Sequence, residues 1–325
     1  MAFEKTARRF FMVVFGGLML SPHVWPQTAN SDGPKTSPGR QEEKQEKIVV
    51  DVDLVNISFS VLTKKGALVT DLQQSDFKVF ENSTLQNITN FSRETNLPLT
   101  IGLLIDTSNS IRDKIKFEQE AAIDFFHSTL RRKRDKGALI TFDSNVQILE
   151  DFTDDPDVLT KAVKRIKPGG GTKMYDAIYM VCKEKLINEF GSRNVLLLIS
   201  DGDDNMSNET FESALEMAQR AEVSIYTIST NTSGFFGMAA PKDDKILKKL
   251  AEETGGRAFY PAKSDELAQS FYDVGQELRS QYSLAYRSTN KVRDGSFRSV
   301  KIESDRKDVR VKARKGYYAP RGSTS

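Results

Sequence analysis

The protein has 325 residues, of which 38% are hydrophobic and 28% charged, a balance typical of globular domains. Its formal net charge is +2, and residues 1–29 contribute all of it, because Lys5, Arg8 and Arg9 outnumber Glu4. The rest of the chain is neutral, which argues against a nucleic-acid-binding protein and excludes a strongly acidic tail.

Residues 1–29 have the pattern of a signal peptide. The basic residues precede the apolar stretch FFMVVFGGLML, which is short for a membrane span. We expect cleavage near residues 25–30, with Ala29 as the best candidate; the alternative is an uncleaved membrane anchor. No second apolar stretch of membrane length follows in the sequence. The expectation is an exported protein, periplasmic or secreted, with no membrane span after cleavage.

Residues 30–47, NSDGPKTSPGRQEEKQEK, lack apolar side chains and predict a disordered linker. Residues 48–96 then show the alternation of β-strands. IVVDVDLVNISFSVLT is the first of these strands, KKGALV is a turn and a short strand, and DFKVFEN and LQNITNFSRE are two more. About four strands are too few to bury a core by themselves.

From residue 97 to residue 281 strands alternate with helices, which predicts an α/β domain with an open, doubly wound, Rossmann-like sheet. NVLLLIS is apolar throughout, as expected for a strand that is covered on both faces. GALITF and VQILEDF are separated by three residues, which predicts antiparallel neighbours. We expect helices at residues 111–132, 157–166, 174–188, 210–221, 242–254 and 265–280.

Residues 282–318 again predict strands, and residues 319–325 form a short tail. QYSLAYRS, SFRSVKIES and DVRVKARK are the three strands. Together with the four of residues 48–96 they reach the count of an immunoglobulin-like sandwich. We therefore expect both flanks to fold into one all-β sandwich, with the α/β domain inserted between two of its strands. The alternative is two independent β appendages.

Two buried strands of the α/β domain end in aspartate, in LLIDTSNS at Asp106 and in LLLISDGDDN at Asp201. Parallel strands carry their carboxyl ends to one edge of the sheet, so the two carboxylates are expected there together. The loop KPGGGTK can bring Thr172 to the same edge, and Ser108 and Ser110 follow Asp106. Carboxylate and hydroxyl oxygens suit Mg²⁺ or Mn²⁺.

The order Asp106-Thr107-Ser108-Asn109-Ser110, Thr172 and Asp201-Gly202 resembles the metal-ion-dependent adhesion site of a von Willebrand factor type A domain. The flanking segments are similar to a bacterial family, abundant in acidobacteria, that is described as related to this domain. The resemblance implies that Ser108 and Ser110 ligate the metal directly and that the two aspartates act mainly through water. Thr172 would bind directly or through water.

Other readings of these residues are weaker. GGGTK lacks the Gly-Lys-Ser/Thr order of a phosphate loop, and DGDDNMSNETFE has Met206 where a calcium loop needs glycine. An aspartate-dependent phosphohydrolase would use Asp106 as its nucleophile. Such enzymes usually need a second carboxylate two residues later, and that position is Ser108. The two histidines, His23 and His127, are not expected at this edge, so Ser-His-Asp catalysis is not indicated. Cys182 lies on an apolar helical stripe and is expected in the core.

The resulting hypothesis is a non-enzymatic, metal-dependent protein-binding module with no catalytic residues. Two carboxylates balance a divalent cation, and an open coordination position accepts an Asp or Glu carboxylate from a protein partner. There are two alternatives. One is a structural envelope protein whose metal site stabilises the fold, and the other is the aspartate-dependent phosphohydrolase.

Overall fold

The computed structural model describes residues 54–93, 97–109, 114–231 and 242–322. The predicted signal peptide and linker lie outside the described residues, as does Ser110. The described residues form one compact unit. In the described residues no helix is long and apolar enough to cross a membrane.

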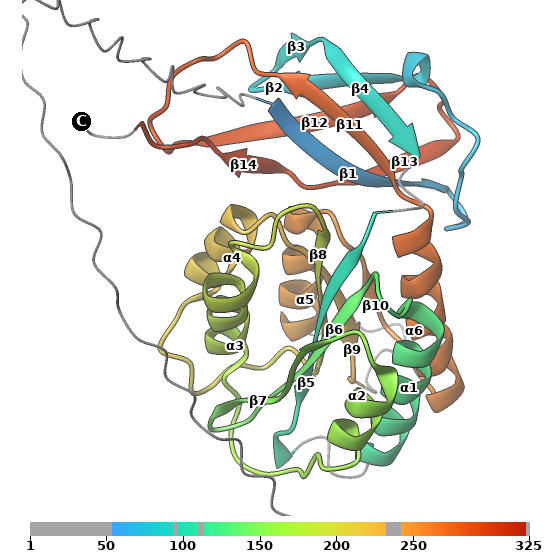
Figure 1. Ribbon diagram of the computed structural model, residues 1–325, viewed down its shortest axis with the longest axis vertical. Coiled ribbons are helices and arrows are strands. Elements are labelled where there is room, and N and C mark those ends of the chain that lie inside the picture. Colours follow the sequence, from blue (N-terminus) through green and yellow to red (C-terminus); the bar gives the residue numbers. More distant parts are fainter. Residues whose placement is uncertain (1–53, 94–96, 110–113, 232–241, 323–325) are drawn as a thin grey trace, which may run out of the picture. The chain divides into compact units, whose positions relative to one another are not determined.

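The central sheet contains six strands in the order β10-β9-β8-β5-β6-β7 (Figure 1). In chain order these strands are β5 (Leu99–Asp106), β6 (Lys136–Phe142), β7 (Val146–Thr153), β8 (Arg193–Ser200), β9 (Ser224–Ser229) and β10 (Ala258–Phe259). β7 runs antiparallel to β6, and all other neighbours are parallel. Every residue of β5 and β8 is buried, which explains their unbroken apolar runs. The doubly wound sheet and the antiparallel pair are confirmed.

Helices cover both faces of this sheet. They are α1 (Ile115–Thr129), α2 (Pro156–Val163), α3 (Met174–Val181), α4 (Phe211–Arg220), α5 (Lys242–Thr254) and α6 (Ser264–Arg279). Figure 1 shows α1, α2 and α6 on one face and α3, α4 and α5 on the other. Successive residues of β5 point to opposite faces, so Leu103 and Ile105 join the first core while Leu104 joins the second.

The predicted helix over residues 174–188 is split into two conformations. The α-helical part ends at Val181 and continues as a π-helical turn, Cys182–Leu186, in which the Ile187 amide donates to the Cys182 carbonyl at 2.9 Å. Cys182 is fully buried in the core, as expected. Burial raises the pKa of its thiol, so the thiolate is disfavoured.

The two flanks form two antiparallel four-stranded sheets, in the orders β13-β1-β11-β4 and β14-β12-β2-β3 (Figure 1). Their strands are β1 (Leu54–Thr63), β2 (Phe77–Glu81), β3 (Thr84–Gln86), β4 (Ile88–Arg93), β11 (Tyr282–Arg287), β12 (Phe297–Ser304), β13 (Val309–Ala313) and β14 (Gly316–Tyr318). β1 lies between β11 and β13, and β2 pairs with β12. Strands from both ends of the sequence therefore share each sheet, which confirms the shared β-sandwich and contradicts independent appendages.

One core lies between the two sheets of the sandwich. It contains Phe59 of β1, Val79 of β2, Tyr282 of β11 and Ile302 of β12. Phe59 stacks on Tyr282, with ring centroids 5.5 Å apart. The sequence predicted seven strands, and the described residues contain eight. LQNITNFSRE forms two strands, β3 and β4, the predicted strand in KKGALV is only an isolated bridge at Leu68, and the three-residue strand β14 was too short to show alternation.

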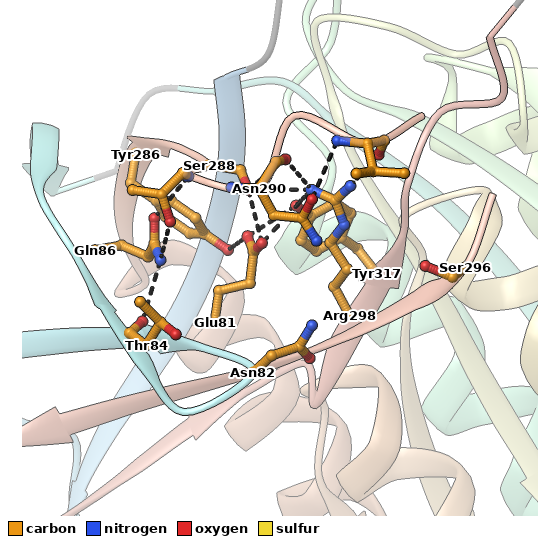
Figure 2. A network of polar contacts seen from close by, with 12 residues as sticks. Glu81, Asn82, Thr84, Gln86, Tyr286, Ser288, Asn290, Ser296, Arg298 and Tyr317 are labelled. Atoms are coloured by element: carbon orange, nitrogen blue, oxygen red, sulfur yellow. Dashed lines mark hydrogen bonds and ion pairs between the residues drawn. The ribbon is translucent and has the colours of Figure 1, made fainter. Parts of the chain in front are cut away.

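A buried polar network also joins the two flanks (Figure 2). At its centre is Glu81, the last residue of β2. Glu81 accepts hydrogen bonds from the hydroxyls of Tyr286 and Tyr317, each at 2.9 Å, and of Ser288 at 2.7 Å. Arg298 lies 3.5 Å from the same carboxylate. The N-terminal flank thus contributes the negative charge, and the C-terminal flank contributes the donors.

A second buried network links the sandwich to the α/β domain through Gln281, which lies between α6 and β11. Its amide oxygen accepts from Arg193 at 2.8 Å, and its amide nitrogen donates to Tyr226 at 3.2 Å and to Ser60 at 3.4 Å. Tyr226 in turn donates to Glu277 of α6 at 3.1 Å. These contacts fix the end of α6 against both β1 and the central sheet.

Candidate metal centre

The two strand-end aspartates lie at the same edge of the central sheet. Asp106 is the last residue of β5, and Asp201 directly follows β8. β5 and β8 are parallel neighbours with Ile105 opposite Ile199, so the residues after this pair leave the sheet side by side. Asp106 is 0% exposed, whereas Asp201 is half-buried. One carboxylate is therefore fixed in the protein, and the other borders the solvent.

Hydrogen bonds fix the orientation of the Asp106 carboxylate. One oxygen accepts from the Ser108 amide at 2.8 Å, and the other accepts from the Ser200 hydroxyl at 2.8 Å. Burial raises the pKa of Asp106 to about 6, the hydrogen bonds from Ser108 and Ser200 oppose this rise, and the charge of Asp201 adds to it. A nearby cation would reverse this rise, because it favours the ionised form.

The glycine-rich loop reaches the same edge. The Gly169 amide donates to the Thr107 carbonyl at 2.6 Å, which ties the loop to the residue after Asp106. Gly170 has φ +82°, and a Cβ there would lie 2.5 Å from the Ser144 hydroxyl, so glycine is required. Thr172 follows, 3% exposed, with its amide donating to the Asn205 side chain at 3.0 Å.

Four of the five predicted ligands are thus described. Asp106, Ser108 and Thr172 are buried, and Asp201 is half-buried, in three segments that contact one another at the sheet edge. Ser110, the fifth predicted ligand, lies outside the described residues. These oxygen donors fit Mg²⁺ or Mn²⁺ chemically. Within the described ranges no group of three or more His, Cys, Asp or Glu side chains could hold a metal. A metal ion at this edge would therefore need hydroxyl oxygens as ligands in addition to the two carboxylates.

The loop after Asp201 makes more side-chain hydrogen bonds than the sequence suggested. We expected Asp203 and Asp204 to be solvated, and Asp203 is exposed. Asp204, however, is half-buried and accepts from the Tyr175 amide at the start of α3, at 2.9 Å, and from the Ser207 hydroxyl at 2.7 Å. A carboxylate used in this way caps a helix, which weakens the calcium-loop reading.

The sequence analysis missed Glu118, a residue of the first turn of α1. Its side chain is 1% exposed, although the sequence around it has the pattern of an ordinary amphipathic helix, in which a glutamate is expected at the surface. Burial, followed by repulsion from Asp106, raises the pKa of Glu118 to about 8, with Lys114 opposing the rise and Asp201 adding to it. The signal for this burial was its spacing, because Glu118 stands four residues before the core residue Ala122.

Histidine chemistry is not available from His127. This residue lies in the last turn of α1, far along the helix from the sheet edge where α1 begins. Its ring is 3.0 Å from the Thr160 hydroxyl of α2, on the exposed surface. The expectation that His127 is a surface or packing residue is confirmed.

Comparison with known proteins identifies the α/β domain. The family model of the von Willebrand factor type A domain matches residues 100–273. No curated protein matches the chain.

Several solved structures are similar in arrangement but remote in sequence. BatB, a conserved hypothetical protein from Bacteroides thetaiotaomicron, is 14% identical with a TM-score of 0.45, over 56% of this chain and 100% of that one. The vWF domain of the type V pili tip protein Mfa5 from Porphyromonas gingivalis is 14% identical with a TM-score of 0.47, over 56% and 95%.

Proximal thread matrix protein 1 from the mussel byssus, in a structure with a zinc-occupied MIDAS motif, is 16% identical with a TM-score of 0.49. That match covers 62% of this chain and 50% of the mussel chain. The family match is the finding that decides identity, because it spans more than half of the chain and includes the strand ends that carry Asp106 and Asp201. The chain belongs to the von Willebrand factor type A domain family.

Proposed function

We propose that the protein is an exported, divalent-metal-dependent protein-binding module, and that it is not an enzyme. The observation that carries the proposal is the meeting of Asp106, Asp201 and Thr172 at one edge of the sheet. Ser108 and Ser110 complete the proposed ligand set. We further propose the division into a signal peptide (1–29), a linker (30–47), sandwich segments (48–96 and 282–318) and a type A domain (97–281).

The charges of the site support binding rather than catalysis. Two carboxylates balance the charge of Mg²⁺ or Mn²⁺, while the hydroxyls of Ser108, Ser110 and Thr172 add oxygen ligands without adding charge. When bound, the cation supplies an electrophilic position that an Asp or Glu carboxylate of a protein partner can occupy. Asp106 is held by Ser108 and Ser200, so its own oxygens keep their direction while a partner binds or leaves.

Cation binding is the first test. Isothermal titration of the full chain with Mg²⁺ and with Mn²⁺ is expected to show one site, and Asp201→Asn is expected to weaken it strongly. Asp203→Asn is the matched control, because it neutralises an exposed carboxylate two residues along the same loop. Absence of binding at millimolar cation, or equal binding by both variants, contradicts the proposal.

Partner binding is the second test and separates a binding module from a structural protein with a fold-stabilising cation. The full chain is used as bait on native envelope proteins, with and without EDTA. A protein that is retained in Mg²⁺, released by EDTA and not retained by Asp201→Asn supports the binding module. A cation that raises the melting temperature while no protein is retained supports the structural alternative instead.

A phosphohydrolase remains the weaker candidate. Asp106 is fully buried and both of its oxygens accept hydrogen bonds, an arrangement that suits a fixed ligand better than a nucleophile that must reach a phosphorus atom. Hydrolysis of a generic phosphoester by wild type, and its loss when Asp106 is replaced, would favour the phosphohydrolase.

A further inference from the structure

The position of Glu118 in α1 is unusual for a glutamate. It lies on the stripe of α1 that faces the core, one turn before Ala122 and two before Phe125. α1 follows the loop that leaves β5 after Asp106, so its first turn lies at the level of the sheet edge. The carboxylate of Glu118 is therefore buried close to the candidate metal centre, and its charge interacts with those of Asp106 and Asp201.

Neither carboxylate oxygen of Glu118 has a hydrogen-bond partner within the described residues. The other buried carboxylates in these ranges all have partners. Asp106, Asp135, Asp244, Glu81 and Glu277 each accept at least one hydrogen bond from a side chain or a backbone amide. A buried polar group without a partner is costly and rare in folded proteins. Glu118 therefore requires an explanation that the packing of α1 does not supply.

The charges around Glu118 indicate what is missing. Asp106 and Asp201 repel it, and Lys114, the residue just before α1, is the cation that acts on it. The Lys114 ammonium, however, donates to the Thr230 carbonyl just after β9. The Thr230 hydroxyl is itself buried without a partner in the described part of the chain. Three carboxylates thus share one sheet edge with one lysine, an arrangement that favours an additional cation.

We propose that Glu118 is the third carboxylate of the cation site and acts as a positioning residue in its outer shell, through space or through water. This inference rests on the proposed function. Direct ligation is not claimed, because Glu118, Asp106 and Asp201 do not form a group that could hold a metal by themselves. From the outer shell, Glu118 strengthens cation binding and leaves the open coordination position free for a partner carboxylate.

The test compares cation affinities of the full chain. Titration with Mg²⁺ and Mn²⁺ is carried out on wild type, Glu118→Gln, Glu118→Met and Asp106→Asn. Glu120→Gln is the control, because it neutralises an exposed carboxylate two residues away on the same helix. We expect both Glu118 variants to bind about tenfold more weakly or worse, the usual effect of removing an outer-shell carboxylate, while Glu120→Gln binds as wild type.

Melting temperatures in EDTA give the second readout. If Glu118 has a purely structural role, its variants should melt below wild type in the absence of cation. If it acts in the outer shell of the cation, the variants should melt at the same or a higher temperature, because an unpartnered buried carboxylate has been removed. Wild-type affinity in Glu118→Gln, or a lowered melting temperature in EDTA, overturns the inference. Failure of the proposed function looks different: wild type binds no cation, or Asp106→Asn binds as well as wild type.

Discussion

The Ser200 hydroxyl donates to Asp106 at 2.8 Å and so joins the last residues of two neighbouring strands, β8 and β5. The same hydroxyl accepts from the Gly202 amide at 3.0 Å, which places the start of the Asp201 loop. One side chain therefore orients both predicted carboxylate positions.

Ser200→Ala is expected to weaken Mg²⁺ binding several-fold and to lower the free energy of unfolding by about 1–3 kcal/mol, because a buried carboxylate loses a donor. Ser229→Ala is the matched control. Ser229 ends β9 and donates to Asp244 at 2.6 Å, an equivalent buried contact that reaches a candidate ligand only indirectly, through Asn231, which donates to Asp244 and to the Asp201 carbonyl. Titration calorimetry and urea unfolding measure the two effects. Equal losses of cation affinity in both variants would show that the Ser200 contact has no special part in the site.

The stability of the cation-free protein is expected to fall as the pH rises from about 4.5 to about 8. The pKa of Glu118 is raised from 4.5 to about 8 and that of Asp106 from 3.8 to about 6. A carboxyl group with a raised pKa binds more protons in the folded state than in the unfolded state, so stability decreases with pH across that interval. Excess Mg²⁺ is expected to reduce the decrease, because a cation favours the ionised groups.

Urea unfolding in EDTA at several pH values checks this expectation. Glu118→Gln should flatten most of the slope between pH 6 and pH 8, since Asp106 titrates below it. Burial acts to raise the pKa of Asp135, but hydrogen bonds from Arg131, the Leu99 amide and Arg279 together lower it, so its influence is confined to the acid side. A wild-type profile that is level or rises with pH over this interval contradicts the prediction.

Glu81→Gln is expected to destabilise the sandwich by about 3–5 kcal/mol, because it leaves the buried Arg298 without its counter-charge. Lys78→Gln is the control. Lys78 pairs with Asp305 at 2.7 Å and also connects β2 to the C-terminal flank, but both side chains are exposed, so no measurable loss is expected. Urea unfolding compares the variants, and a similar loss in both would mean that burial does not decide the strength of these pairs.

Removal of residues 282–325 is expected to unfold the N-terminal flank. β1 would lose both of its neighbouring strands, β11 and β13, and Phe59 would lose Tyr282, which stacks on it in the core. Limited proteolysis should then cut within residues 54–93 and spare most of the type A domain. Protection of residues 54–93 in the truncated chain would show that the N-terminal strands fold without the C-terminal ones.

Much of the fold could be predicted because local pattern and tertiary burial agree. The apolar runs that end at Asp106 and Asp201 identified two central strands, and the parallel arrangement then implied one shared edge. Glu118 could not be found in this way. Its spacing to Ala122 places it on the core-facing stripe of α1, but a charged side chain is expected at the surface, and the packing of α1 against the sheet shows that it is buried. The contacts of Thr172 depend on side chains such as Asn205, distant in sequence, whose direction no pattern gives.

The interleaving of β1 with β11 and β13 also determines when the chain can fold. Leu54 lies opposite Arg287, and Thr63 lies opposite Val309, so the first strand to be synthesised pairs with strands that are made more than two hundred residues later. Until the last strands have emerged, β1 lacks both of its neighbouring strands, β11 and β13, while the type A domain between them can already be complete. Such long-range pairing slows folding and leaves a strand edge open to aggregation. A chaperone that shields this strand during synthesis would be most useful in that interval.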